Sequence, residues 1–177
     1  MSDIVTAPKA WKFGDHIDTD LMLPGALLWR SPEERARAVF QSIRPGWVDE
    51  VQQGDALVAG FNFGCGSSRP AALSLRLCGI GFVLAETMNG LFFRTAVNFG
   101  LRAFECTGIA AAVEEGDPLE LSIERWTVRN VRTAAVLNVK PIPPLPLSIM
   151  LTGGVAQLLK EQQPTAPPLK EAAKHDN

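Results

Sequence analysis

Residues 56–85 read ALVAGFNFGCGSSRPAALSLRLCGIGFVLA, and this stretch decides the fold that the sequence predicts. The apolar runs Ala56–Gly60 and Phe82–Ala85 are typical of buried strands. Between them lie a glycine-containing loop and a helix that Pro70 opens and Gly79 ends. A strand, a helix and a second strand at this spacing predict a right-handed crossover between parallel strands.

The same alternation extends to both sides of this stretch. Downstream, we expect a helix over residues 91–99, closed by Gly100, and a third strand at residues 101–104. Upstream, the sequence Ser-Pro-Glu-Glu at residues 31–34 predicts a helix start. The serine can cap the helix, the proline suits the first helical position and the second glutamate can complete a capping box. We expect this helix to run through about Ser42.

The second half of the chain changes character. Short β-like runs lie at residues 119–123 and 126–131. Residues 141–146 are too rich in proline for a central strand, so we expect a last strand or turn at residues 147–151 and a short helix at residues 155–161. The predicted fold class is therefore α/β, with a mostly parallel central sheet and an added β layer.

The length and composition limit the domain organisation and the partners. A chain of 177 residues is long enough for one compact domain and too short for two of ordinary size. We expect that domain to span residues 1–161, followed by a disordered tail at residues 162–177, which is rich in proline, alanine and charge. A net charge of -2 argues against a nucleic-acid partner, and no apolar run reaches the ~18 residues that a membrane helix needs. No secretory leader is visible, so the expected location is the cytoplasm.

The cysteines and histidines do not form a recognisable metal site. Cys65, Cys78 and Cys106 are too widely spaced for such a site, and their odd number does not fit a disulfide framework. Cys78 and Cys106 lie in apolar stretches and are expected to be small apolar residues. Because His16, expected on a loop surface, and His175, in the tail, are far apart, we expect this chain to bind no metal itself. Any metal cofactor would then belong to another chain.

The loop between the first two predicted strands has the features of an anion-binding site. It lies at the carboxyl end of a strand, where ligands bind in open α/β sheets, and it leads into a helix start, whose dipole and unpaired amides favour an anion. Gly64 and Gly66 allow a ligand to approach the backbone closely. Arg69 can grip a carboxylate through two parallel hydrogen bonds, and Ser67 and Ser68 add hydroxyls at the same place.

Several functions can be weighed on this loop alone. A Walker phosphate loop needs a Gly-Lys-Ser/Thr sequence, which is absent, and a dinucleotide fingerprint fails because Arg69 replaces its third glycine. A self-sufficient serine hydrolase is disfavoured because the chain has no Gly-x-Ser-x-Gly elbow. Two interpretations stay open: carboxylate binding with a serine as base or nucleophile, and a tight strand-to-helix turn with capping serines.

Four segments resemble, in the same order, the small subunits of isopropylmalate isomerase and its aconitase-superfamily relatives. They are residues 14–24 (GDHIDTDLMLP), 62–69 (NFGCGSSR), 93–101 (FRTAVNFGL) and 152–154 (TGG). The resemblance implies the swivelling β/β/α fold, docked on a large subunit that holds a [4Fe-4S] cluster. It also implies a hydro-lyase that removes water from a hydroxy polycarboxylate and adds it back, with 3-isopropylmalate isomerisation in leucine biosynthesis as the first expectation.

The resemblance further implies roles for individual residues. Ser67 would be the base that takes the proton alpha to a carboxylate, while Gly66, Ser68 and Arg69 would bind substrate oxygens. A serine hydroxyl is a poor base at neutral pH, so an ionised Ser67 would need Arg69 and the loop amides in a dry, closed site. The iron of the partner would polarise the departing hydroxyl as a Lewis acid.

Two further groups of residues are candidates for the same site. Asp18, Thr19 and Asp20 could form an Asx-type turn that shapes their loop, or they could border the site and position the serine loop. Leu28 and Trp29 lie in the following loop, which in this family reaches the variable group of the substrate. They would suit an apolar branch, or they could instead pack under the next helix.

The chain departs from the family pattern directly after the signature arginine. Pro70-Ala71-Ala72 stands where an acidic residue and a histidine are usual. This departure is compatible with a divergent paralogue that acts on another substituted malate or homologue, and with a module that binds carboxylates without chemistry. The sequence does not choose among isopropylmalate, a methylated malate and a longer homologue.

Overall fold

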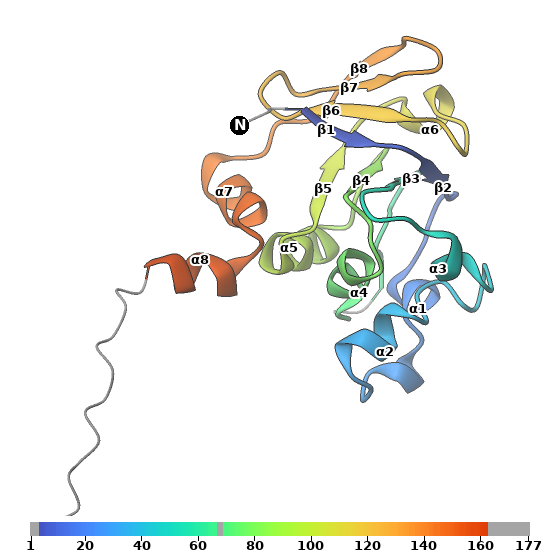
Figure 1. Cartoon of the computed structure of the whole chain (residues 1–177), viewed down its shortest axis with the longest axis vertical. Helices are drawn as coiled ribbons and strands as arrows, with labels where there is room; N and C mark the ends of the chain where they lie inside the picture. Colours follow the sequence, from blue (N-terminus) through green and yellow to red (C-terminus); the bar gives the residue numbers. More distant parts are fainter. Residues whose placement is uncertain (1–3, 67–68, 163–177) are drawn as a thin grey trace, which may run out of the picture.

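The computed structural model describes residues 4–66 and 69–162, which form three layers (Figure 1). The central layer is a parallel sheet whose strands lie in the order β2 (Ala10–Lys12), β3 (Ala56–Ala59), β4 (Phe82–Ala85) and β5 (Arg102–Glu105). The outer layer is an antiparallel sheet in the order β1 (Ile4–Ala7), β6 (Leu119–Ser122), β7 (Thr127–Asn130) and β8 (Val136–Asn138). Helices α4 (Ala71–Leu77) and α5 (Gly90–Phe99) cover the other face of the parallel sheet.

The alternation of side chains along β3 explains why its sequence is apolar throughout. Leu57 and Ala59 belong to the core beneath the helices, whereas Ala56 and Val58 belong to a second core shared with the outer sheet. Because successive residues of a strand point to opposite faces, a strand covered on both sides needs apolar residues at every position. The predicted α/β class, with a mostly parallel sheet and an added β layer, is confirmed.

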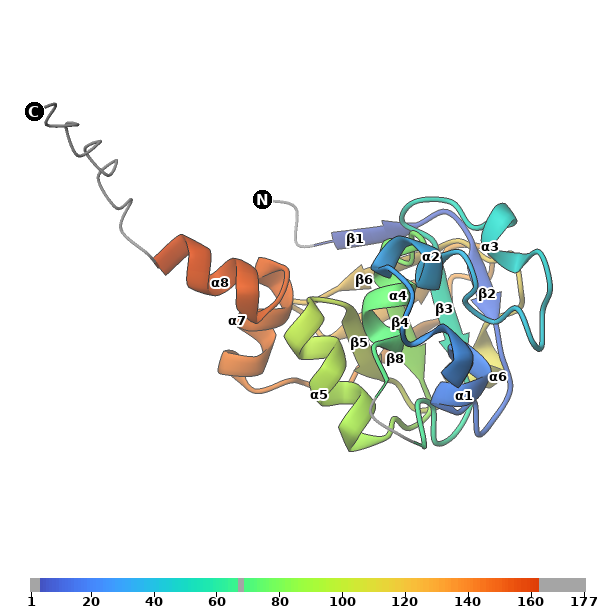
Figure 2. The ribbon, with the colours of Figure 1, turned by 90° about the horizontal axis from the view of Figure 1, so that it is seen from below.

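The remaining helices are short or lie near the end of the chain. They are α1 (Thr19–Met22), the 3-10 turn η1 (Gly25–Leu27), α2 (Pro32–Ala36), α3 (Trp47–Glu50), α6 (Ile109–Ala112), α7 (Pro144–Thr152) and α8 (Val155–Gln162). Figure 2 shows α7 and α8 beyond α5, on the side away from β2. The predicted tail, except Gln162 at the end of α8, lies outside the described residues. Within residues 4–66 and 69–162, every helix is too short or too polar to cross a lipid bilayer.

The helix predicted to run from Ser31 to about Ser42 is shorter than expected. Its capping box is present as predicted, but α2 ends at Ala36. Downstream, Phe40 has a φ of 56° and donates its N–H to the C=O of Met22 at 3.0 Å. The Phe40 ring stacks on Phe13 with centroids 4.2 Å apart. A continued helix would not allow this backbone conformation, so long-range aromatic packing outweighs local helix propensity here.

The last strand or turn predicted at residues 147–151 is wrong, because these residues belong to helix α7. Pro144 and Pro146 lie in its first turn, where backbone N–H groups have no partner within the helix, so neither proline removes a helical hydrogen bond. The helix packs against α5 and buries Met150. The prolines therefore exclude a central strand, as expected, but they are compatible with a helix start.

A buried carboxylate ties the outer sheet together. Asp117 is 3% exposed and accepts hydrogen bonds from Asn130 Nδ2 at 2.6 Å and from Glu114 N–H at 3.0 Å. Arg132 Nε donates to its other oxygen. The Arg132 guanidinium beside it holds the pKa of the Asp117 carboxyl well below its ordinary value of 3.8. The folded state therefore stabilises the ionised form of Asp117.

We expect Asp117→Asn to lower the free energy of unfolding by about 2 kcal/mol at pH 7, because it removes charge-assisted hydrogen bonds. Urea unfolding measures this change. Glu114→Gln is the matched control, since Glu114 pairs with the same Arg132 but its side chain is 75% exposed, and it should have little effect. A depressed folded pKa contributes stability above the unfolded pKa, and this stability is lost as the pH falls toward the folded pKa. The difference between wild type and Asp117→Asn should therefore shrink below about pH 4, and a pH-independent difference would contradict this assignment.

Candidate active site

The loops after β2 and β3 lie side by side at the carboxyl end of the parallel sheet. Backbone hydrogen bonds join them, among them those from His16 N–H to Phe61 C=O (2.8 Å), from Gly64 N–H to Ile17 C=O (2.8 Å) and from Thr19 N–H to Cys65 C=O (2.9 Å). The parallel pairing thus continues beyond the strands and brings the segments 14–24 and 62–69 together. Figure 2 shows α1 and the start of α5 at this same end of the sheet.

The loop after β3 turns sharply and packs closely on α5. Gly64 and Gly66 have φ values of 74° and 93°, in the left-handed region that favours glycine. A Cβ atom at Gly64 would overlap the side chain of Phe92 in α5. The Phe92 ring packs edge-on against Phe63, with centroids 5.1 Å apart. Gly64 therefore allows the loop to pack directly against the helix.

Arg69 is the described member of the predicted serine–arginine group. Ser67 and Ser68 lie outside the described residues, so their roles as base and substrate ligand stay predictions. The Arg69 side chain is 16% exposed, and its Nη2 forms an ion pair with the carboxylate of Asp20. Its Nη1 donates to the C=O of Leu23 at 3.2 Å. The arginine of one loop is thus held by the neighbouring loop.

The three residues Asp18, Thr19 and Asp20 occupy different environments. Asp18 caps α1, and its Oδ1 accepts the N–H of Leu21 at 2.7 Å, which is the geometry of an Asx-type turn. Thr19 is 2% exposed. Asp20 has a side chain that is 57% exposed, and it contacts Arg69. Asp20 is therefore in direct contact with a residue that the resemblance assigns to substrate binding.

The loop predicted to reach the variable group of the substrate starts at Gly25, which lies beside the Arg69 side chain. A Cβ atom on Gly25 would lie 2.9 Å from Arg69 Nη1, so the absence of a side chain there leaves room for the guanidinium. Leu28 is half-buried. Trp29 is 93% exposed and therefore does not pack under α2, which was the alternative to substrate binding.

His16 and Asn62 form a pair that the sequence does not predict. Asn62 Nδ2 lies 3.2 Å from His16 Nδ1; His16 is exposed and Asn62 is half-buried. Both residues have positive φ values, 54° for His16 and 57° for Asn62, a conformation that asparagine adopts more readily than most residues. The pair links the two loops at the point where they leave the strands. The local signal for such a turn is the asparagine three residues after the end of β3.

Cys78 and Cys106 have the apolar environments that the sequence predicts for them. Burial raises the pKa of the Cys78 thiol to about 12 and that of Cys106 to about 11, so both remain protonated at neutral pH. Cys65 is half-buried in the loop after β3. In the part of the chain that the structure describes, no three His, Cys, Asp or Glu side chains are grouped so that they could hold a metal ion.

Comparison with known proteins places this geometry among related chains. Residues 44–106 match the family model described as Aconitase C-terminal domain. The chain is 39% identical over 168 residues to "3-isopropylmalate dehydratase small subunit 1" of Methanopyrus kandleri, covering 94% of this chain and 98% of the relative. It is 41% identical over 156 residues to the "Isopropylmalate/citramalate isomerase small subunit" of Methanocaldococcus jannaschii, covering 87% of this chain and 93% of the relative. A crystal structure titled 3-isopropylmalate dehydratase, also from M. jannaschii, aligns with a TM-score of 0.84 at 32% identity over 90% of this chain and 95% of the other.

Proposed function

The chain belongs to the family of 3-isopropylmalate dehydratase small subunits, and on this premise we propose that it binds the substrate of a hydro-lyase that it forms with a large subunit. The full-length match to these relatives supports the class of reaction, the removal and return of water on a small hydroxy acid. The observation that supports the site most directly is the contact between Arg69 and Asp20, which joins the two loops of the family resemblance.

We propose a malate with an apolar branch as the substrate, with 3-isopropylmalate first and citramalate second. The names of the relatives from M. kandleri and M. jannaschii support these two acids. The loop that starts at Gly25, beside the Arg69 guanidinium, continues into Leu27, Leu28 and Trp29. A carboxylate bound at Arg69 would therefore lie beside Gly25, which is followed in the sequence by apolar residues. The exposed side chain of Trp29 is available to cover an apolar branch of the substrate.

The proposed partner is a large subunit that holds a [4Fe-4S] cluster. Two of the three cysteines of this chain support that division, because burial raises the pKa values of Cys78 and Cys106 and ligation requires a thiolate. When bound on the partner, the cluster would supply a Lewis acid for the departing hydroxyl. The residues of this chain would bind a substrate carboxylate and accept the proton.

In this mechanism Arg69 binds a carboxylate and Ser67 accepts the proton alpha to it. Asp20 pairs with Nη2 of the guanidinium in the free chain, and we propose that this contact orients the fork that binds a substrate carboxylate. Developing negative charge on Ser67 would be offset by Arg69 and by loop amides, which are worth most once the large subunit excludes water. The subunit interface is therefore part of the proposed chemistry.

The departure at Pro70-Ala71-Ala72 has a structural basis. Ala71 is 1% exposed and Ala72 is 0% exposed, and both belong to the core beneath the parallel sheet. Helix α4, which begins at Ala71, packs against α2. The small side chains thus allow close helix packing at this position. This packing supports the interpretation that the departure from the family pattern serves the fold. It does not require that the neighbouring Arg69 site be lost.

Reconstitution with a large subunit of the same enzyme family tests the proposal. We expect the isolated chain to be inactive and the complex to hydrate and isomerise an alkyl-substituted malate, with higher kcat/KM for 3-isopropylmalate than for unbranched malate. A stable complex that binds these acids but turns none of them over would instead support the non-catalytic carboxylate-binding module.

Replacing Asp20 by Asn should show whether Asp20 acts by orienting Arg69 or by binding the substrate itself. The change removes the charge that orients Arg69, and a small displacement of a substrate-positioning group can lower kcat by about 10–100-fold. KM should change little, because the guanidinium that contacts the substrate carboxylate is still present. Asp18→Ala is the matched control, since it removes the cap of α1 and should lower stability by about 1 kcal/mol with a smaller effect on kcat. Steady-state kinetics of the complex decide the matter, and a kcat for Asp20→Asn within about twofold of wild type would remove Asp20 from the positioning role.

A further inference from the structure

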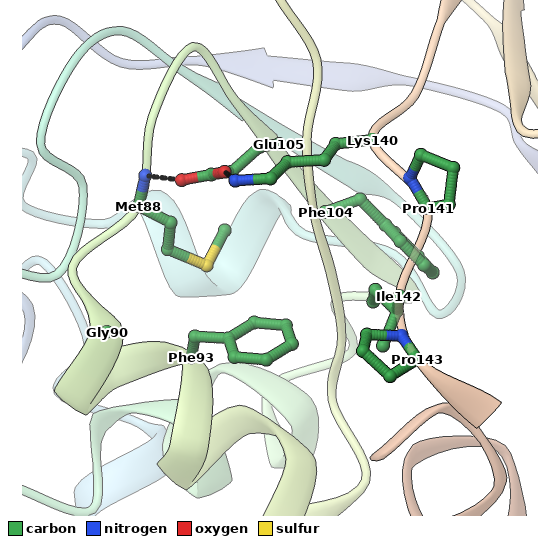
Figure 3. A pocket seen from close by; sticks show the side chains of 9 residues that line it. All are labelled: Met88, Gly90, Phe93, Phe104, Glu105, Lys140, Pro141, Ile142 and Pro143. Carbon is green, nitrogen blue, oxygen red and sulfur yellow. Dashed lines mark hydrogen bonds and ion pairs between the residues drawn. The ribbon is translucent and has the colours of Figure 1, made fainter. Parts of the chain in front are cut away.

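A cavity of about 300 Å³ lies beside β5, and its lining includes none of the residues assigned above (Figure 3). Its walls come from the start of α5, from β5 and from the connection between β8 and α7. Apolar side chains form most of the wall, namely Met88, Phe93, Phe104, Pro141, Ile142 and Pro143. The charged side chains in the lining are Glu105 and Lys140, which Figure 3 shows together on one side of the cavity.

The two charged residues differ in how firmly they are held. The Glu105 side chain is 24% exposed, and its Oε1 accepts the N–H of Met88 at 2.8 Å while its Oε2 pairs with Lys140 Nζ at 2.5 Å. The Lys140 side chain is 72% exposed. A partly buried carboxylate with a backbone donor stays in place, whereas an exposed ammonium on a flexible stem can change partners at small cost.

The ion pair also borders a second, open hollow on the protein surface. This groove of about 740 Å³ shares Glu105, Lys140 and Pro141 with the cavity, and its other lining includes the polar residues Glu86, Thr87, Thr107 and Asn138. Glu105 and Lys140 therefore stand between an apolar cavity and a polar groove that is open to solvent. A ligand with an apolar tail and a charged head could enter from the groove and leave its head at the ion pair.

We propose that the cavity binds a small aliphatic α-amino acid, with its side chain among Met88, Phe93 and Ile142. Its ammonium group would meet the fixed carboxylate of Glu105, and its carboxylate would meet Lys140, which moves outward by a side-chain rotation. A simple fatty acid would place its carboxylate against Glu105, and a simple amine would displace Lys140 without giving it a new partner. The pair of opposite charges therefore selects a zwitterion. This inference does not depend on the proposed hydro-lyase activity.

The direct test is calorimetric titration of the full chain with three probes that share one alkyl tail. L-norleucine has both head groups, hexanoate lacks the ammonium and pentylamine lacks the carboxylate. We expect norleucine to bind about tenfold more tightly than either of the other two, because each loses one charge-assisted contact. Equal affinities for the three probes, tighter binding of hexanoate, or no binding of norleucine would overturn the proposal.

Two further measurements locate the binding. Lys140→Gln should weaken norleucine binding about tenfold and strengthen pentylamine binding, because the amine no longer has to displace the Lys140 ammonium from Glu105, while the same substitution at Lys160, on α8, should change neither. In protein labelled at the methionine methyl groups, norleucine should shift the NMR signal of Met88. The signals of Met22 and Met150, which are buried in the two cores, should stay in place. A norleucine affinity that survives Lys140→Gln, or an unmoved Met88 signal, would show that the ligand lies elsewhere.

Discussion

The Ser67→Ala variant, assembled with its large subunit, is expected to lose about 10²–10⁴-fold in kcat, the usual contribution of a positioned general base. Alanine cannot accept the proton alpha to the substrate carboxylate. KM should change little, because the main carboxylate contact is assigned to Arg69. The rate of exchange of the substrate's alpha proton with deuterated water should fall in parallel with kcat.

Ser68→Ala is the matched control for this prediction. It removes a neighbouring hydroxyl of the same size, which the family resemblance assigns to substrate binding, so it should act mainly on KM. Both variants should assemble with the large subunit as wild type does, which gel filtration measures. Full turnover by the Ser67→Ala complex would falsify the assignment of Ser67 as the base.

Arg69→Ala is expected to lower kcat/KM by about 10²–10³-fold, because the guanidinium both binds the carboxylate and stabilises negative charge on the serine. Arg69→Lys keeps the charge but loses the planar fork, so it should recover only part of the activity. The fold should tolerate the change, because the Asp20 side chain is 57% exposed and water can replace its partner. We therefore expect the free energy of unfolding to change by about 1 kcal/mol.

A double-mutant cycle connects this result to the structure. If Asp20 acts through Arg69, then Asp20→Asn should have almost no further effect on kcat in an Arg69→Ala background. Independent, additive losses from the two substitutions would mean that Asp20 acts on another group. A kcat/KM for Arg69→Ala close to that of wild type would mean that the substrate carboxylate binds elsewhere.

The strands of the parallel sheet could be predicted because short, continuous apolar stretches of sequence indicate that they are buried. β3 and β4 are apolar at every position, and Pro70 and Gly100 mark where helices begin and end. The end of α2 could not be predicted locally, because it depends on Phe40 stacking on Phe13, 27 positions earlier in the chain. Helix α7 was missed because prolines were read only as strand breakers, whereas a first helical turn accepts them.

The sequence could predict which loops form the candidate site, but not which side chains contact one another there. Parallel strands bring the loops that follow them to one edge, so the sequence could place Asp20 near the serine loop. The ion pair between Asp20 and Arg69 and the pair between Glu105 and Lys140 link residues far apart in sequence, and no local pattern marks either. The exposure of Trp29 could not be predicted either. The sequence allowed its apolar side chain to pack under the next helix, but the side chain is 93% exposed.

A crystal structure of the reconstituted complex with 2-isopropylsuccinate would test the central proposal most directly. This acid has the two carboxylates and the apolar branch of the proposed substrate but lacks the hydroxyl that must leave. We predict one carboxylate on the Arg69 fork, with the Ser67 hydroxyl facing the adjacent carbon and Asp20 still in contact with the guanidinium. Carboxylates bound only by the large subunit, with Arg69 turned away from the ligand, would contradict it.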